Sequence, residues 1–196
     1  QRTQMWVRFA ETAVYLSGRL GESDFDRMVA TEMRHDAARS LGQNEIINFA
    51  FDTFDDRRNG YSFYIKPLGG QGEGQVSNEG HFNGDWNGIW ESATGRFDDG
   101  WTVEMALPFK TLRYQRDDTQ IWGFQIQRPN RWKNEVTFLA PSDPARGPAG
   151  FMMASLWATV VGIEVPPPAM NLDIKPYAIS DLTTDRIASP PLSNAA

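Results

Sequence analysis

The sequence of 196 residues contains no cysteine, and this absence excludes whole classes of chemistry. Disulfide bonds, thiolate metal sites and cysteine nucleophiles are all ruled out. The absence does not fix the compartment, because it suits a bacterial exported protein as well as a cytosolic one. The formal net charge is −6. This lack of basic excess argues against nucleic acid or anionic lipid as a partner, since both require a basic surface.

Long apolar runs are also missing from the sequence. No run reaches the roughly 18 residues that a membrane-spanning helix needs. The longest candidate, MMASLWATVVGIEV (residues 152–165), is too short and is followed by prolines. No secretory signal is recognisable, and the chain begins with a strand-like pattern. We therefore expect an internal segment of a longer protein, so the missing signal says nothing about export.

Helical periodicity is scarce, and alternation with a period of two residues dominates. Only SDFDRMVATEMR (residues 23–34) is typical of a helix, with Ser23 as its N-cap. About eight or nine short segments alternate between apolar and polar residues, with hairpin turns between them. This pattern predicts an all-β fold over residues 1–165: a jelly-roll-like antiparallel β-sandwich with one or two short helices. The prolines after residue 165 indicate a linker that opens a further segment, residues 166–196.

The hairpin over residues 89–108 predicts the direction of individual side chains. Asp99 and Gly100 are expected to form its turn. Strand side chains alternate between the two faces of a sheet, so Glu104 should face solvent while its neighbours face the core. The side chains that this alternation predicts to be buried, together with those of two further strand tryptophans, are Trp90, Trp101, Val103, Met105 and Trp122.

No catalytic constellation stands out in the sequence. The chain has two histidines, His35 and His81, and lacks the G-x-S-x-G nucleophile motif. Glycosidases need two carboxylates across a cleft, and Glu91 and Glu104 lie on adjacent strands of the predicted hairpin, where they could face each other. The simpler interpretation is favoured, in which both are solvated strand residues that stay apart because like charges repel. The sequence therefore predicts a protein that is not an enzyme.

The stretch FDTFDDRRNG (residues 51–60) offers oxygen ligands for a hard cation such as calcium. The alternative is a charged hairpin turn, whose carboxylates accept bonds from backbone amides and pair with Arg57 or Arg58. We favour this turn, because the two guanidinium groups would repel the ion, and calcium stays open as a cofactor. Asn59 and Gly60 are expected to supply the positive φ angles of the turn. The candidate metal ligands are Asp52, Asp55, Asp56 and Asn59.

Two polar loops carry tryptophans in a setting that is typical of sugar recognition. Sugar sites combine flat aromatic faces with planar hydrogen-bonding side chains. The stretches NEGHFNGDWNGIW (residues 78–90) and QRPNRWKNE (residues 127–135) both have this composition. The alternative is that each tryptophan folds back as a lid over the core. The candidate ligand-binding residues are His81, Asp85, Trp86, Asn87, Asn130, Arg131 and Trp132.

Three longer stretches resemble a group of bacterial outer-membrane proteins: FDTFDDRRNGYSFYIKPLGGQGEG (51–74), DWNGIWESATGRFDDGWTVEMALPFKTLRYQ (85–115) and WGFQIQRPNRWKNE (122–135). These proteins carry a domain similar to the family 9 carbohydrate-binding module, followed by a large C-terminal barrel. The resemblance covers about residues 5–180. Its most specific parts are the D-G-W-x-x-E-x-x-x-P element and the Asp-rich hairpin.

The resemblance implies a β-sandwich that binds an oligosaccharide or polysaccharide without catalysis, and it implies bound calcium in related modules. It also implies export to the periplasmic face or the surface of the outer membrane, with residues 166–196 as the start of the barrel. An alternative stays open: a structural domain that docks on its own barrel, or plugs it, and binds no sugar. A haem-binding sandwich is disfavoured, because Met33 and His35 would point apart on a helix.

Overall fold

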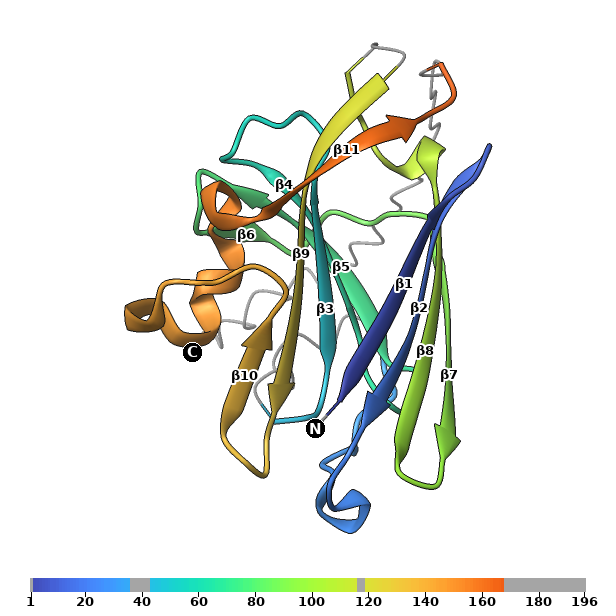
Figure 1. The fold of residues 1–196 in the computed structure, drawn as a ribbon, viewed down its shortest axis with the longest axis vertical. Coiled ribbons are helices and arrows are strands. Elements are labelled where there is room, and N and C mark those ends of the chain that lie inside the picture. Colours follow the sequence, from blue (N-terminus) through green and yellow to red (C-terminus); the bar gives the residue numbers. More distant parts are fainter. Residues whose placement is uncertain (1, 36–42, 116–118, 168–196) are drawn as a thin grey trace, which may run out of the picture.

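The computed structural model describes residues 2–35, 43–115 and 119–167, which form two antiparallel β-sheets packed face to face (Figure 1). One sheet has four strands in the order β1-β2-β8-β7. The other has seven, in the order β10-β9-β3-β4-β5-β6 with β11 paired to β9. This architecture confirms the predicted antiparallel sandwich. The strands are β1 (Thr3–Phe9), β2 (Ala13–Gly21), β3 (Ile47–Asp52), β4 (Gly60–Ile65), β5 (Gln71–Ser77), β6 (His81–Asn83), β7 (Glu91–Phe97), β8 (Gly100–Pro108), β9 (Thr119–Asn130), β10 (Glu135–Phe138) and β11 (Ala158–Glu164).

Apolar side chains from both sheets meet between them and form the main core. Aromatic rings of the seven-stranded sheet contact edge to face there, with the Phe51 and Trp122 centroids 6.2 Å apart. Removing one such side chain from water stabilises the fold by about 1.5–3 kcal/mol, which favours the registers that keep every inward position apolar. Glu104 of β8 is exposed, as predicted. The residues predicted to be in the core, Trp90, Trp101, Val103, Met105 and Trp122, are all buried.

The turn between β7 and β8 lies one residue earlier than predicted. Phe97 pairs with Gly100, so Asp98 and Asp99 form the two-residue connection and Gly100 begins β8. A Cβ at Gly100 would lie 2.1 Å from the carbonyl oxygen of Leu20 on β2. Glycine is therefore required here by the close approach of the neighbouring strand, more than by the turn itself.

The predicted helix over residues 23–34 is reduced to a single 3-10 turn, η1 (Phe25–Arg27). The following residues run without helix beside the segment that enters β3. The Glu45 backbone N–H donates to the Val29 carbonyl oxygen at 2.8 Å, and Asn44 Oδ1 accepts from the Thr31 backbone N–H at 2.7 Å. These long-range bonds replace the local ones that a helix would make, so tertiary contacts override the helical pattern.

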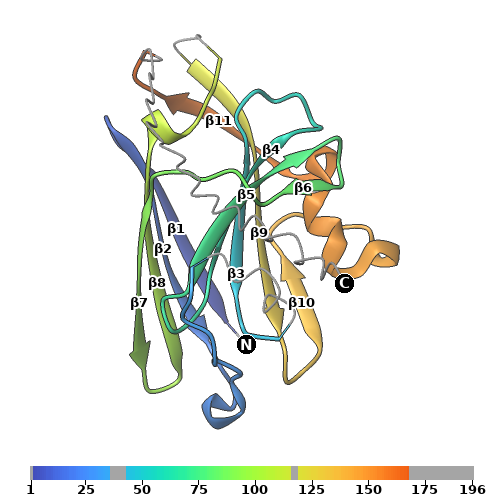
Figure 2. The same cartoon turned by 180° about the vertical axis from the view of Figure 1, so that it is seen from behind.

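The connection between β10 and β11 covers the outer face of the seven-stranded sheet. Figures 1 and 2 show this segment, with η4 (Pro144–Met152) and η5 (Ala154–Leu156), on the side of the sandwich away from the four-stranded sheet. A second small core forms there, where Phe151, Ala154 and Trp157 pack against Ala50 of β3. The Trp157 ring lies so close to Gly60 that a Cβ at Gly60 would be 2.6 Å from it.

The predicted second segment, residues 166–196, lies outside the described residues except for residues 166 and 167. β11 ends at Glu164, one residue before the predicted boundary of the sandwich. A last 3-10 turn, η3 (Phe109–Thr111), follows β8. Of the helical segments in the part of the chain that the structure describes, none is long and apolar enough to cross a membrane.

Candidate functional site

The loop after β6 uses its tryptophan to close the core. Trp86 is half-buried, and its ring centroid lies 4.9 Å from that of Tyr61 and 6.0 Å from that of Phe63. Both partners belong to the main core on β4. Trp86 therefore behaves as a lid, one of the two alternatives that its sequence context offered. The remaining candidates of this loop, His81, Asp85 and Asn87, are exposed.

The second candidate group, residues 130–132, lies in the turn between β9 and β10, far from the first. The backbone of this turn donates a hydrogen bond to Glu45 Oε1 at 2.8 Å. Trp86, in contrast, contacts the β4 residue that pairs with Phe51. Glu45 lies two residues before β3 begins, and Phe51 is the fifth residue of β3. The four strand steps from Ile47 to Phe51 alone correspond to roughly 13 Å at about 3.3 Å per residue. The structure does not bring Trp86 and Trp132 together in one cleft.

Polar side chains connect the two sheets at the end of the sandwich that carries this turn. The buried Arg128 reaches from β9 across to the four-stranded sheet, where it donates to the Glu22 carboxylate and to the Gly21 carbonyl oxygen. The candidate Asn130 donates through Nδ2 to Glu22 Oε2 at 3.1 Å. Burial raises the pKa of the neighbouring Glu45 to about 7. Asn130 thus has a structural role in a contact between the sheets.

The Asp-rich loop between β3 and β4 is organised by the carboxylates of its own residues. Asp52, which is fully buried, accepts hydrogen bonds from the backbone N–H groups of Phe54, Asp56 and Arg57 at 3.2, 3.3 and 2.8 Å. One carboxylate thereby satisfies three amides that the tight path of the loop leaves without strand partners. Burial raises the pKa of Asp52, and these bonds oppose the shift.

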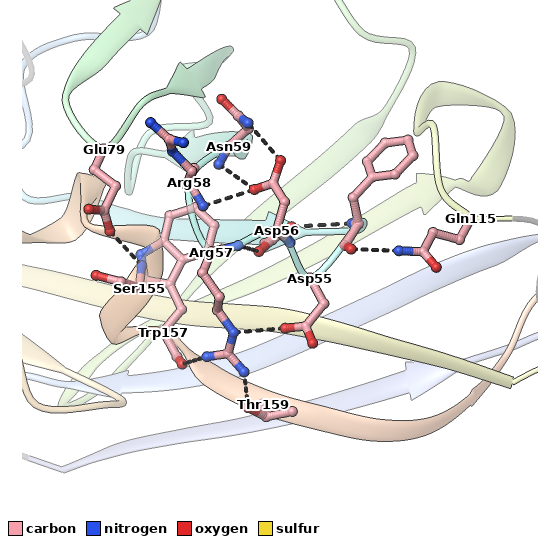
Figure 3. Close-up of polar contacts among 12 residues, drawn as sticks. Asp55, Asp56, Arg57, Arg58, Asn59, Glu79, Gln115, Ser155, Trp157 and Thr159 are labelled. Carbon is pink, nitrogen blue, oxygen red and sulfur yellow. Dashed lines mark hydrogen bonds and ion pairs between the residues drawn. The ribbon is translucent and has the colours of Figure 1, made fainter.

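The second half of the loop repeats this arrangement around Asp56 (Figure 3). Its carboxylate accepts from the backbone N–H groups of Arg58 and Asn59, each at 2.8 Å, and from Asn59 Nδ2 at 2.6 Å. The residues with positive φ are Asp55 at 50° and Arg57 at 58°. The expectation that Asn59 and Gly60 supply these angles is wrong, because the loop makes two Asp-centred turns in place of one hairpin turn.

Arg57 ties this loop to the segment that covers the seven-stranded sheet. Its Nε lies 2.8 Å from Asp55 Oδ1, and its guanidinium donates to the Trp157 carbonyl oxygen at 3.3 Å and to Thr159 Oγ1 at 2.7 Å (Figure 3). Nearby, the backbone N–H of Ser155 donates to Glu79 Oε1 at 2.8 Å. The predicted turn of Asp-to-backbone and Asp-to-Arg bonds is therefore present, and it also braces the covering segment.

The arrangement of this loop does not fit a calcium cage. A calcium ion needs several oxygen ligands that converge on one point, whereas these carboxylates are engaged with amides and with a guanidinium group. Within the described ranges, no group of three or more His, Cys, Asp or Glu side chains is placed to hold a metal ion. Calcium binding by Asp52, Asp55, Asp56 and Asn59 stays a prediction for experiment.

A groove that the sequence reasoning did not identify lies on the outer face of the four-stranded sheet. It has a volume of about 620 Å³. Trp6 of β1 is 52% exposed and Tyr15 of β2 is 44% exposed, and both line it. Trp6 pairs with Ser17 and Arg8 pairs with Tyr15, so the two rings are diagonal neighbours, with backbones about 7–8 Å apart. We call this hollow the face groove.

Three charged side chains of the face groove are uncommitted. Arg8, Glu91 and Glu104 make no ion pair and no side-chain hydrogen bond with any other residue that the structure describes. Glu91 pairs with Ala106 and Glu104 with Ala93, so the two carboxylates share one face as diagonal neighbours, as their hairpin suggested. The groove thus presents two aromatic faces, one donor fork and two carboxylate acceptors to solvent.

The opposite outer face, on the seven-stranded sheet, has no comparable uncommitted groups among its described amide side chains. Asn48 Nδ2 donates to Gln127 Oε1 at 2.6 Å, and Gln127 Nε2 donates to the Pro148 carbonyl oxygen at 2.7 Å. Gln125 accepts from the Ala140 backbone N–H at 2.9 Å and donates back to its carbonyl oxygen at 3.2 Å. These amides anchor the covering segment, so the face groove is the better candidate site.

Known structures with the same fold include carbohydrate-binding modules. A family 9 carbohydrate-binding module from Caldicellulosiruptor kristjanssonii in complex with glucose aligns with a TM-score of 0.55 and 14% identity, over 88% of this chain and 81% of that chain. Its complex with cellotriose aligns with 0.54 and 14%, over 90% and 83%. A candidate carbohydrate-binding protein from Bacteroides uniformis aligns with 0.61 and 9%, over 82% and 78%.

At these low identities the likeness establishes the fold, which is a β-sandwich of the family 9 carbohydrate-binding-module type. This confirms the fold that the sequence resemblance implied. No protein-family model and no curated protein matches the sequence. The function must therefore be argued from the site, because one fold can carry unrelated functions.

Proposed function

We propose that this domain is a non-catalytic saccharide-binding module whose ligand lies in the face groove. The observation that carries the proposal is the pair of exposed rings, Trp6 and Tyr15, beside the uncommitted Arg8, Glu91 and Glu104. Exposed aromatic faces bury the apolar side of a sugar ring, while a guanidinium donates to hydroxyl oxygens and carboxylates accept from hydroxyl hydrogens. Glucose and cellotriose in the complexes with similar folds support a neutral saccharide as the ligand.

A hydrolytic role for Glu91 and Glu104 is disfavoured by their surroundings. A retaining or inverting glycosidase needs one carboxylic acid that stays protonated near neutral pH, and burial in an apolar pocket normally keeps it so. Both carboxylates are exposed on the face of an open sheet. The non-catalytic nature of carbohydrate-binding modules with this fold supports the same conclusion.

Calorimetric titration of the domain with neutral oligosaccharides tests the proposal. The probes are cello-, xylo- and manno-oligosaccharides, each as a trisaccharide. We expect one of them to bind, and Trp6→Ala to weaken it at least about tenfold, because the ring supplies much of the buried contact area. Phe82→Ala removes an aromatic ring of comparable exposure from β6 of the other sheet and is the matched control. Binding that survives Trp6→Ala but is lost in Trp86→Ala would move the site to the β6–β7 loop.

The wider setting of the domain is proposed from the sequence resemblance. We propose that the domain belongs to an exported protein, at the periplasmic face or the surface of the outer membrane, beside a C-terminal barrel. Fractionation of cells that express the full-length protein, with detection by an antibody against the sandwich, tests this location. Recovery in the cytosolic fraction would contradict it.

The alternative role, a domain that docks on its own barrel, has one observation in its favour. Ile121 of β9 and Val161 of β11 are paired neighbours, and they are 48% and 68% exposed. An exposed apolar pair at a sheet margin is typical of a small contact surface. Ile121→Asp should release such a contact without changing saccharide affinity, and crosslinking yield between the sandwich and the rest of the full-length protein would measure it.

A further inference from the structure

The face groove does not end at the edge of the four-stranded sheet. A second hollow, of about 940 Å³, lies at the end of the sandwich between the start of β2, the end of β8 and the β3–β4 loop. Tyr15, Glu91 and Ala106 line both hollows, so the two hollows adjoin at these residues, and we call the adjoining pair the channel. We call this second hollow the end groove.

The end groove continues the aromatic lining of the face groove. Phe54, in the β3–β4 loop, is 44% exposed and lines it, so exposed rings occur in the order Trp6, Tyr15 and Phe54 along the channel. Trp6 lines the face groove only, Tyr15 lines both and Phe54 lines the end groove only. A series of exposed rings along one open channel is suited to successive units of a chain.

The wall of the end groove is held in place before any ligand arrives. Asp52 Oδ1 accepts from the Phe54 backbone N–H, and the Phe54 carbonyl oxygen accepts from Gln115 Nε2 at 2.7 Å. The Arg113 backbone N–H donates to the Tyr61 hydroxyl at 3.2 Å, and its carbonyl oxygen accepts from Thr53 Oγ1. The wall formed by residues 53–54 and 113–115 is thus anchored to the core, and a fixed wall reduces the ordering cost of binding.

We propose that the ligand is the interior of an oligosaccharide chain, which lies along both grooves and places successive units against Trp6, Tyr15 and Phe54. This inference rests on the proposed saccharide function and adds the ligand's length and mode of recognition. Because the channel is open, it lacks the closed pocket that recognition of one chain end would need. The ligand is therefore recognised along its length.

A length series separates this inference from the proposed function. The probes are the mono-, di-, tri- and hexasaccharides of the cello, xylo and manno series, together with borohydride-reduced hexasaccharides, in which the ring at one chain end is opened. In the series that binds, the trisaccharide should bind at least about tenfold tighter than the monosaccharide, since each further ring contact adds roughly 1.4 kcal/mol. The reduced and unreduced hexasaccharides should bind equally.

Single substitutions test which aromatic side chains the oligosaccharide contacts. Phe54→Ala should weaken hexasaccharide binding roughly tenfold more than disaccharide binding, whereas Tyr15→Ala should weaken both. Phe82→Ala is the control, and thermal melts check that each variant folds. Equal affinity for the mono- and hexasaccharide, or loss of binding on reduction of the chain end, would overturn this inference and leave saccharide binding intact. Failure of every length in every series would overturn the proposed function, and this inference with it.

Discussion

The outer faces of the two sheets contrast more than their sequences suggest. On the four-stranded sheet, Trp6 and Tyr15 are exposed to solvent. They lie beside Arg8, Glu91 and Glu104, which make no ion pair with any residue that the structure describes. On the seven-stranded sheet, Gln125 and Gln127 are buried under residues 139–157 and bonded to them. In both sheets, outward-facing residues alternate along the strands with inward-facing core residues. The period-two pattern of the sequence therefore does not distinguish one outer face from the other. What separates them, within the described residues, is a later segment of the chain that returns to cover the face of the seven-stranded sheet.

This contrast shows that exposed aromatic residues and planar amides do not by themselves identify a ligand surface. The amides of the seven-stranded sheet have the chemistry of a sugar site, but they are already bonded to backbone groups of the covering segment and to one another. No residue that the structure describes covers the rings and charges of the four-stranded sheet in this way. A surface can bind a ligand through groups that folding leaves uncommitted, because a group that already has a partner must break that bond first.

The largest expected effect comes from removing the cover. Trp157 is fully buried against Gly60, and its Nε1 donates to the Phe151 carbonyl oxygen at 2.9 Å. Trp157→Ala should lower the free energy of unfolding by about 3–5 kcal/mol, the usual cost of a large cavity. Trp6→Ala, on the open face, should lower it by less than about 1 kcal/mol. Urea denaturation of both variants measures the difference, and equal losses would show that the two faces are equally packed.

Glu45 should make the stability of the domain fall as the pH rises from about 4.5 to about 7. Burial, opposed by the Arg131 backbone bond and assisted by the Glu22 carboxylate, raises its pKa from 4.5 to about 7 in the folded protein. The folded state therefore holds a proton that the unfolded chain releases, so this contribution is fully present below pH 4.5 and is lost as the pH rises through 7. At about 1.4 kcal/mol per pKa unit, the change in the free energy of unfolding is at most about 3.5 kcal/mol.

Glu45→Gln tests this pH dependence, because the amide keeps the shape and an acceptor for the Arg131 backbone N–H. The variant should lose less stability than the parent between about pH 5 and about pH 8, as measured by denaturant unfolding. If the free energy of unfolding falls equally steeply with pH in the variant and in the parent, a group other than Glu45 is responsible for the pH dependence. This prediction concerns the polar contact between the two sheets at the end of the sandwich that carries the β9–β10 turn.

Asp52→Ala should lower the free energy of unfolding by about 2–3 kcal/mol. It leaves the backbone N–H groups of Phe54, Asp56 and Arg57 without their acceptor, and unsatisfied buried donors are costly. Asp85→Ala, in an exposed loop, is the control and should change stability by less than about 0.5 kcal/mol. Thermal and urea unfolding give both values, and a loss as small as that of the control would exclude the loop as a brace for the covering segment.

The effect of calcium on stability tests whether the β3–β4 loop is a metal site. We expect melts in chelator and in millimolar calcium to agree, because the loop carboxylates already have amide and guanidinium partners. A metal site would instead raise stability by roughly 2.7 kcal/mol at about a hundredfold excess over the dissociation constant. A rise that Asp55→Ala abolishes would show that the loop binds the ion and that our interpretation of it is incorrect.

A further expected effect is on affinity and concerns one charge of the open face. Glu104→Gln keeps the shape of the side chain but replaces a charged acceptor, so saccharide affinity should fall roughly tenfold while stability is unchanged. Glu135→Gln, an exposed substitution on β10, is the matched control. Calorimetric titration of the two variants with the trisaccharide that the parent domain binds most tightly measures the change in affinity. Unchanged affinity in Glu104→Gln would remove this carboxylate from the proposed site.

The sequence by itself determined the sandwich, the inward positions of β8 and the Asp-centred bonds of the β3–β4 loop. These features depend on neighbours within a strand or a turn, where alternation and side-chain reach are set by local geometry. The tertiary structure alone decided that Trp86 is a lid and that residues 28–34 are not helical. It also decided that the face of β1 and β2 is left open while the face of β3 and β9 is covered. Each of these outcomes depends on a partner distant in the sequence, such as Tyr61 for Trp86, Glu45 for Val29 or Trp157 for Gly60. A local sequence pattern does not specify which distant segment of the chain will pack against it.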